Sequence, residues 1–261
     1  MDPFIKWLRE QNLISKGDVV YVISDMFGLS KAYHEKGLKL DLNVLIDGLW
    51  DIVGPDGTLL FPAFNWDFCK GVGFDVLKTP CKTGALPKAA LKREDYVRTA
   101  HPLYSFAVKG RLTKEFMALD PTNAFGEGTI FELFEKYDAK ALAIGVGALS
   151  GFTYIHHVEK TVGVDFRYDK NFTAEYTDRF GNTSVKTYSM YVRDLDLDPR
   201  HINGFEPLEK IMLDKGIIKR AYFGDVMCSS FKVNDTTDVI KDDLVNNGAA
   251  NMYTFADAGD R

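Results

Sequence analysis

A strand, a helix and a second strand follow one another within about 45 residues near the start of the chain. Residues 18–24, DVVYVIS, form a short β-branched apolar run that predicts a buried strand. Residues 43–53, NVLIDGLWDIV, have helical periodicity and lead into the turn GPDG at 54–57, after which residues 58–64, TLLFPAF, predict a second strand. This order is typical of a parallel crossover unit, so the sequence favours an α/β protein.

Further elements are predicted along the rest of the chain. Asp2 and Pro3 provide a cap and a first residue for an N-terminal helix. The segments on either side of RFGN, residues 179–182, predict a β-hairpin. The other predicted elements are helices over 111–118, 128–137, 205–215 and 235–246 and strands over 140–147, 217–223 and 225–231. We therefore expect one α/β domain over residues 1–261, with a mixed β-sheet flanked by helices and an antiparallel C-terminal portion.

The region between about 65 and 105 has weak periodicity and is rich in Gly, Pro, Lys and Thr. A long irregular stretch inside a compact domain is more often functional than idle, so we expect part of a binding site there.

Composition limits the classes of protein and partner. The 261 residues are 46% apolar and 26% charged, as in ordinary globular proteins, and the net charge of −5 argues against a nucleic-acid partner. Three widely spaced cysteines without a CxxC pair argue against a disulfide framework and for a reducing compartment. The sequence shows neither a secretory signal nor an apolar run long enough to span a membrane. We expect a cytoplasmic protein without a membrane span.

The segment GFTYIHHVEK, residues 151–160, places two histidines side by side. If it is helical, Thr153, His156 and Glu159 share one face, while His157 points about 100° away. A carboxylate beside His156 would fix its tautomer and stabilise its protonated form, which prepares a general base. Thr153 would donate its hydroxyl to a developing oxyanion, or it would cap the helix.

Other interpretations of this cluster stay open on the pattern alone. A short polar helix with solvated histidines has the same spacing. Zinc binding is less favoured, because the HExxH pattern needs two histidines one turn apart and HHVEK lacks that spacing.

Six segments, which span nearly the first two thirds of the chain, together match one family. They are GDVVYVISD (17–25), GPDGTLLFPAF (54–64), TGALPKAALKRED (83–95), RTAHPLYSFAVKG (98–110), AFGEGTIFELF (124–134) and LAIGVGALSGFTYIHHVEK (142–160). In order and spacing they resemble the aminoglycoside 3-N-acetyltransferases, which are acetyl-CoA-dependent enzymes with an α/β fold distinct from the more common acetyltransferase fold. Family members commonly carry His-Ser-Ser where this chain has Ile23-Ser24-Asp25, so only Ser24 of that motif is shared.

The resemblance implies the roles of several residues. His156 would be the catalytic base, with Glu159 and Thr153 beside it, and acetyl-CoA would lie across the ends of the first strands. The implied cofactor contacts are Ser24, His101, Ser105 and Phe106. Apart from the resemblance, Lys88, Arg93 and Arg98 in the irregular region would pair with the phosphates of acetyl-CoA, or they would be solvated surface charges. His157 would contact the substrate.

The segment RDLDLDP, residues 193–199, alternates aspartates with other residues. As a strand it would place Asp194, Asp196 and Asp198 on one face, where they would hold a cationic acceptor. A solvated edge strand is the alternative.

These features predict an acyl-CoA-dependent N-acyltransferase that moves an acetyl group from acetyl-CoA to a primary amine of an amino sugar, without a metal. The acceptor would be an aminoglycoside or a nucleotide-linked amino sugar of surface polysaccharide biosynthesis, and a homo-oligomer is left open. One alternative is a metal-dependent hydrolase with His101, His156 and His157 as ligands. The other is a non-catalytic sugar- or CoA-binding homologue.

Overall fold

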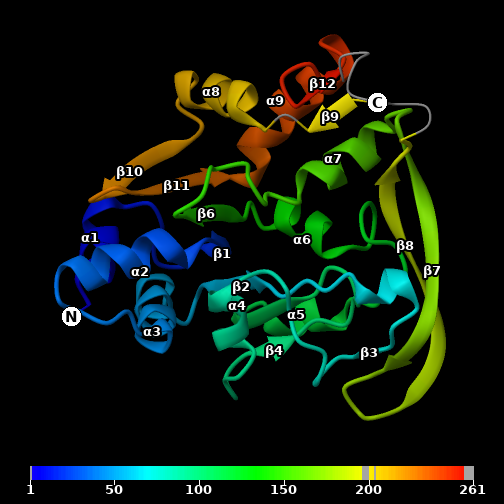
Figure 1. The fold of residues 1–261 in the computed structure, drawn as a ribbon, viewed down its shortest axis with the longest axis horizontal. Coiled ribbons are helices and arrows are strands. Elements are labelled where there is room, and N and C mark those ends of the chain that lie inside the picture. The colour runs from blue at the N-terminus through cyan, green and yellow to red at the C-terminus, as the bar shows by residue number, and fades with distance from the viewer. Residues whose placement is uncertain (1, 196–199, 203, 256–261) are drawn as a thin grey trace.

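The main β-sheet runs through the centre of the molecule (Figure 1). The computed structural model describes residues 2–195, 200–202 and 204–255. Within these residues the sheet has the strand order β10-β11-β6-β1-β2-β5-β4. Its strands are β1 (Val19–Ser24), β2 (Thr58–Pro62), β4 (Val97–Arg98), β5 (Phe106–Gly110), β6 (Lys140–Ile144), β10 (Lys219–Phe223) and β11 (Val226–Lys232). Strand β1 is parallel to β2 and to β6, and the other neighbours are antiparallel, so the sheet is mixed.

A long hairpin forms one side of the molecule (Figure 1). Strands β7 (Arg167–Thr177) and β8 (Thr183–Arg193) pair antiparallel, and β3 (Phe74–Asp75) joins β7 in parallel. The turn between β7 and β8 is held by Asp178, whose Oδ1 accepts the N–H groups of Phe180 and Asn182 at 2.8 and 2.9 Å. The remaining strands, β9 (Arg200–Ile202) and β12 (Tyr253–Phe255), pair with each other.

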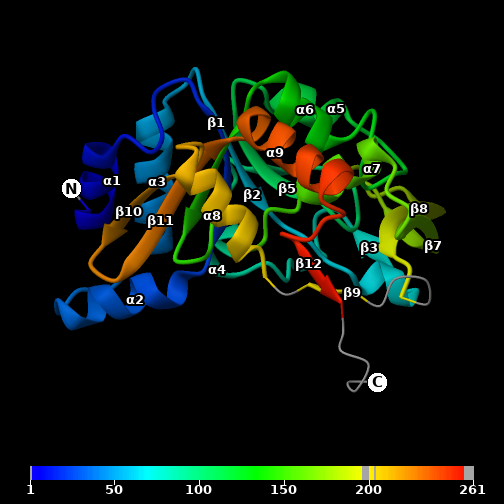
Figure 2. The ribbon, with the colours of Figure 1, turned by 90° about the horizontal axis from the view of Figure 1, so that it is seen from above.

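Helices cover both faces of the main sheet (Figure 2). Because side chains alternate along a strand, Val20 and Val22 of β1 face one helical layer and Tyr21 and Ile23 face the other. On the Val20 side lie α1 (Pro3–Gln11), α2 (Met26–Glu35), α3 (Leu42–Val53) and α4 (Ala85–Ala90). On the Tyr21 side lie α5 (Thr113–Ala118), α6 (Ile130–Lys136), α7 (Ile155–Val162), α8 (Glu206–Asp214) and α9 (Val233–Asn246).

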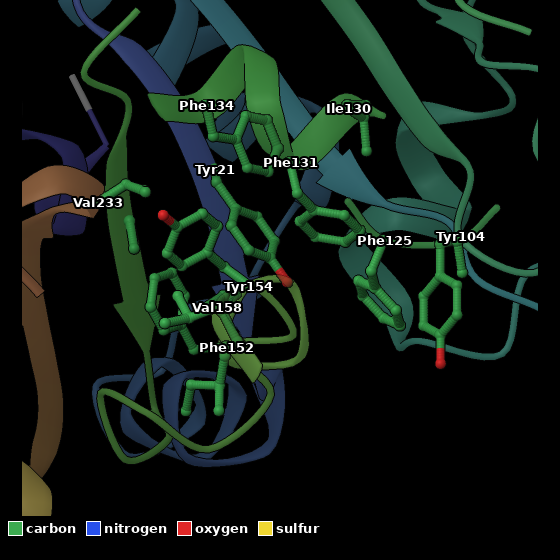
Figure 3. Close-up of a cluster of buried hydrophobic side chains, with 14 of the residues drawn as sticks. Tyr21, Tyr104, Phe125, Ile130, Phe131, Phe134, Phe152, Tyr154, Val158 and Val233 are labelled. Carbon is green, nitrogen blue, oxygen red and sulfur yellow. The ribbon is translucent and has the colours of Figure 1, made fainter. Parts of the chain in front are cut away.

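The core on the Tyr21 side is strongly aromatic (Figure 3). The ring of Tyr21 lies 5.4 Å from those of Phe106 and Phe134, centroid to centroid, and 6.2 Å from that of Phe152. Large buried rings of this kind contribute much of the apolar area of a core and fix its geometry through edge-to-face contacts. The segment that leads into α7 is therefore anchored on a rigid base.

The predicted fold class is confirmed: the protein is α/β, with a mixed sheet flanked by helices and antiparallel pairs toward the C-terminus. The predicted N-terminal helix begins as expected, since Asp2 accepts the N–H of Ile5 at 3.0 Å and Pro3 is the first helical residue. That the whole chain, residues 1–261, forms a single domain stays a prediction. No helix in the described part of the chain is long and apolar enough to cross a membrane.

The predictions missed several elements. Helix α2 escaped notice because Gly28 and Ser30 interrupt its apolar pattern, although Asp25 caps it by accepting the N–H of Phe27 at 2.9 Å. The stretch 65–105, expected to be irregular, contains the 3₁₀ helix η1 (Asp67–Lys70) and the short elements β3, α4 and β4.

Candidate active site

At the adjacent strands β1 and β6 the chain connections leave the sheet in opposite directions. The connection after β1 leads to α2 and α3 on one face, whereas the connection after β6 leads to α7 on the other. The crevice at such a switch point, beyond the carboxyl ends of parallel strands, is the usual ligand site of open α/β sheets. Ser24 ends β1 beside Ile144, the last residue of β6. Gly145 then turns the chain with a φ of +71°, and a Cβ there would overlap the carbonyl oxygen of Asp25.

His156 and Glu159 form a hydrogen-bonded pair on α7. Nδ1 of His156 lies 2.7 Å from Oε2 of Glu159. The imidazole is partly exposed, at 24% of its side-chain area, while the carboxylate is fully buried. Because an ionised carboxylate only accepts, it selects the tautomer with the proton on Nδ1 and leaves the Nε2 lone pair free to accept a proton.

Two further groups hold the buried carboxylate. Nε of Arg167, at the start of β7, lies 2.7 Å from Oε2 as an ion pair without the alignment of a hydrogen bond. The hydroxyl of Tyr253, on β12, donates to Oε1. Burial opposes ionisation of Glu159, but the charges of His156 and Arg167 and the hydrogen bonds outweigh it, so its pKa lies below the ordinary value. The carboxylate is therefore ionised at neutral pH.

A row of aromatic rings lies beside His156. The ring of Phe125 meets the imidazole edge to face with the centroids 5.6 Å apart, and Tyr104 lies 4.9 Å beyond Phe125. Figure 3 shows Phe125 and Tyr104 side by side. Trp66 follows at 6.4 Å from Tyr104 and is 38% exposed. The rings restrict the orientation of the imidazole and give the site an apolar side.

Thr153 precedes the pair in sequence and His157 lies between its two members, and the two residues have different surroundings. Thr153 precedes α7, and its hydroxyl donates to the carbonyl of Gly151 over a long 3.3 Å, so that bond is weak. His157 is buried, accepts the N–H of Gly126 at Nδ1 over 3.2 Å, and stacks on Tyr154. Burial lowers the pKa of His157.

The family model of the aminoglycoside 3-N-acetyltransferases matches residues 30–244. The chain belongs to this family. The six sequence segments and the fold agree with the assignment, which makes the protein an N-acetyltransferase with acetyl-CoA as its co-substrate.

Solved structures with the same fold include family enzymes. The sisomicin-bound structure of AAC-VIa has a TM-score of 0.77 and 20% identity over 93% of this chain and 96% of that one. The binary structure of AAC-IIIb with CoASH has a TM-score of 0.75 and 21% identity, over 93% and 95%. The YokD protein from Bacillus subtilis has a TM-score of 0.74 and 18% identity, over 93% and 98%. At these identities the likeness shows the fold. No curated protein sequence matches the chain significantly.

The cofactor contacts implied for this acetyltransferase lie at different depths. Ser24 is half-buried at the end of β1. Ser105 and Phe106 are fully buried, and the hydroxyl of Ser105 donates to the carbonyl of Ala63 at 2.8 Å and accepts Nε of Arg98 at 2.9 Å. The structure thus brings His156 and Glu159 into contact, with Thr153 just before their helix, while Ser24 lies at the end of β1 and Ser105 and Phe106 lie in the interior. The cofactor roles stay predictions.

His101 is a buried neutral base. Its Nδ1 accepts the N–H groups of Leu103 and Tyr104 at 3.3 and 3.2 Å, so the proton is on Nε2, which has no hydrogen-bond partner in the described chain. Burial lowers its pKa to about 3. His101, His156 and His157 do not form a common ligand set, and no group of three metal-binding side chains occurs among the residues that the structure describes.

The predicted acceptor residues are only partly described. Strand β8 ends at Arg193, and Asp194 follows it with its N–H donated to the carbonyl of Phe166 at 2.9 Å. Of the described residues of the segment 193–199, only Arg193 is therefore in a strand. Asp196 and Asp198 lie outside the described residues.

Sequence reasoning missed Phe125, Arg167 and Tyr253. Phe125 belongs to the matched segment AFGEGT, which marked the region but not its ring contact with His156. Arg167 and Tyr253 carry no local signal, because their role depends on contacts between separate segments.

Proposed function

We propose that the chain transfers the acetyl group of acetyl-CoA to a primary amine of an amino sugar, with His156 as the general base. The observation that supports this most directly is the partly exposed imidazole of α7, held 2.7 Å from a buried carboxylate. A base needs an available lone pair and a defined tautomer; the carboxylate defines the tautomer, and the ring is partly exposed with Nε2 left to accept a proton.

The proposed reaction is direct transfer. The amine nitrogen attacks the thioester carbon, a C–N bond forms, and Nε2 of His156 takes the proton that the nitrogen loses. The tetrahedral intermediate then expels the CoA sulfur as the C–S bond breaks, and the imidazolium returns its proton to the thiolate. Glu159 stabilises the imidazolium in between, and a base placed in this way contributes about 10² to 10⁴ in rate.

Arg167 and Tyr253 have positioning roles in this mechanism. They hold Glu159 ionised and fix its two oxygens, so the carboxylate keeps the imidazole in one orientation. The hydroxyl of Thr153, which has only a weak bond to Gly151, would turn toward the oxyanion as the thioester oxygen gains charge.

The acceptor that we propose first is an aminoglycoside, because the family carries that name and the similar AAC-VIa was solved with sisomicin bound. A nucleotide-linked amino sugar is the second candidate. It is favoured by one observation, a cavity lined by Lys78, Lys88, Lys92, Arg98 and Arg179, whose positive charge would suit an anionic carrier.

The cytoplasm is the proposed location. The thiols of Cys69, Cys81 and Cys228 are all free, as expected in a reducing compartment. A homo-oligomeric state stays a prediction.

Replacement of the proposed base tests the function. In a free-thiol release assay with acetyl-CoA against aminoglycosides and nucleotide-linked amino sugars, we expect His156→Ala to lower kcat by about 10² or more while acetyl-CoA still binds. The matched control is His34→Ala, since His34 is an exposed histidine on α2. Wild-type turnover in His156→Ala would refute the base assignment. A wild-type protein that binds acetyl-CoA but releases no thiol with any acceptor would be a non-catalytic homologue.

A further inference from the structure

A cavity of about 630 Å³ lies between α4, the loop over residues 76–81 and the tip of the β7–β8 hairpin. Its volume is within the range of small-molecule sites, which is about 300–1,000 Å³. None of the residues that line it is acidic. Its cationic lining residues are Lys78, Lys88, Lys92, Arg98 and Arg179. We call this the cationic cavity.

Arg98 brings a buried, unneutralised charge to the cationic cavity. It is 6% exposed, and its guanidinium donates to Ser105 Oγ at 2.9 Å, to the carbonyl of Ala63 at 2.7 Å and to the carbonyl of Thr79. These acceptors are neutral, and no ion pair within 4 Å joins Arg98 to a carboxylate in the described part of the chain; the charge of Asp75, which pairs with Lys78, acts on it from farther away. Burial lowers the pKa of Arg98 to about 10, so it stays cationic at neutral pH. A buried cation without a counter-charge favours the binding of an anion.

The rim adds further cations. Lys88 and Lys92 are exposed on and just after α4, and Arg179 is half-buried at the hairpin tip. None of the three has a carboxylate within 4 Å among the described residues, whereas Lys78 pairs with Asp75 at 3.3 Å. Three positive groups without a carboxylate partner around one cavity suit a phosphorylated ligand, whose negative charge is distributed over several oxygens.

The walls of the cationic cavity are apolar and aromatic. Leu77 and Phe180 are 71% and 82% exposed, which is unusual for such large side chains. Tyr96 also lines the cavity, and its buried hydroxyl has no hydrogen-bond partner in the described chain. A ligand with an anionic group and a planar body would cover the exposed side chains of Leu77 and Phe180.

We propose that the cationic cavity binds a nucleoside phosphate. The hairpin tip and Arg167 lie at opposite ends of β7, about 30 Å apart at the usual rise per residue, and Figure 1 shows α7 at the far end of the hairpin from its tip. The cavity is therefore separate from the His156 pair. In the proposed reaction a nucleotide has two sources, the nucleotide end of acetyl-CoA and a nucleotide carrier on the amino sugar. Which of these two molecules carries the nucleotide rests on the proposed function, whereas the binding of a nucleoside phosphate to the cationic cavity does not.

Isothermal titration calorimetry of the whole chain with ADP tests the binding. We expect wild-type protein to bind ADP, and Lys88→Ala/Lys92→Ala to bind it about tenfold more weakly, since two exposed ion pairs are lost. The matched control is Lys6→Ala/Lys219→Ala, which removes the same charge from exposed positions on α1 and β10. Inorganic diphosphate should bind more weakly than ADP, and Phe180→Ala should reduce that difference. Failure of the wild type to bind ADP at millimolar concentration, or equal affinity in the two double variants, would overturn the proposal.

Steady-state kinetics of the same variants distinguish the sources. If the nucleotide belongs to the donor, Lys88→Ala/Lys92→Ala raises KM about tenfold for acetyl-CoA but not for S-acetylpantetheine, which lacks the nucleotide. If it belongs to the acceptor, KM rises for a nucleotide-linked amino sugar and is unchanged for acetyl-CoA. Loss of ADP binding without either change supports the site as one for a separate nucleotide effector. Should the wild type show no transfer at all, calorimetry still decides whether the cavity binds ADP.

Discussion

Two buried arginines, Arg167 and Arg98, show how the same group serves different purposes in one protein. Arg167 lies against the fully buried carboxylate of Glu159, and although burial alone would lower its pKa, this neighbour raises it. Arg98 has only neutral oxygen acceptors, and burial lowers its pKa to about 10. A charge neutralised within the protein can position a base, whereas one left unneutralised beside a cavity attracts an anion.

The largest effect on stability is expected when the carboxylate partner of Arg167 is removed. Glu159→Gln leaves a buried guanidinium without a counter-charge, so we expect a loss of about 3–5 kcal/mol in the free energy of unfolding, together with a lower kcat. Arg98→Met removes a charge that had no partner and deprives three oxygens of a donor, at a smaller cost of about 1–3 kcal/mol. Urea unfolding of both variants measures the difference. An equal or greater loss in Arg98→Met would show that Arg98 is neutralised after all.

His101 sharpens the comparison because it is a buried base that stays uncharged. Its pKa is about 3 in the folded protein against 6.5 unfolded, so the unfolded chain gains a proton first and stability falls as the pH drops below 6.5. Between about pH 6 and pH 5 this costs about 1 kcal/mol. The variant His101→Asn keeps an acceptor, Oδ1, for the same two N–H groups but has no group that titrates in this range. We therefore expect it to lose about 1 kcal/mol less free energy of unfolding than the wild type between pH 6 and pH 5. The free energy of unfolding at both pH values measures it, and an unchanged slope would contradict the buried neutral state.

Salt gives the smallest expected effect. The rim lysines of the cationic cavity are exposed, so raising NaCl from about 50 mM to about 300 mM should weaken ADP binding about threefold. The Glu159–Arg167 pair is buried and is screened much less. The pH dependence of kcat should therefore stay the same over this range. Calorimetry and pH–rate profiles at both salt concentrations check this contrast, which fails if ADP affinity is independent of salt.

The parts of the fold that the sequence predicts well are those with a local pattern. Strands β1 and β2 and helix α3 lie within two residues of their expected bounds, because an apolar run or helical periodicity determines each one. In the same way, the spacing of His156 and Glu159 predicted a shared helical face, and their side chains do meet.

The remainder depends on contacts between distant segments. Strands β3 and β4 have two residues each, too few for a periodic signal, and they exist because β7 and β5 offer partners. The depth of Ser105 in the core follows from its bonds to Arg98 and to Ala63, 42 residues away, and no spacing rule contains that information. The cationic cavity likewise joins α4 to a hairpin tip far along the chain.

The hydrogen bond from Tyr253 to Glu159 bears on the order in which parts of the chain fold. The two residues are 94 positions apart, so the contact closes a very long loop, and contacts of that kind form late in folding. The helix that bears His156 can assemble early, but its carboxylate acquires all its partners only once β12 has docked. Recovery of enzymatic turnover during refolding should therefore lag behind the return of the helical signal, and turnover would report the final step of assembly.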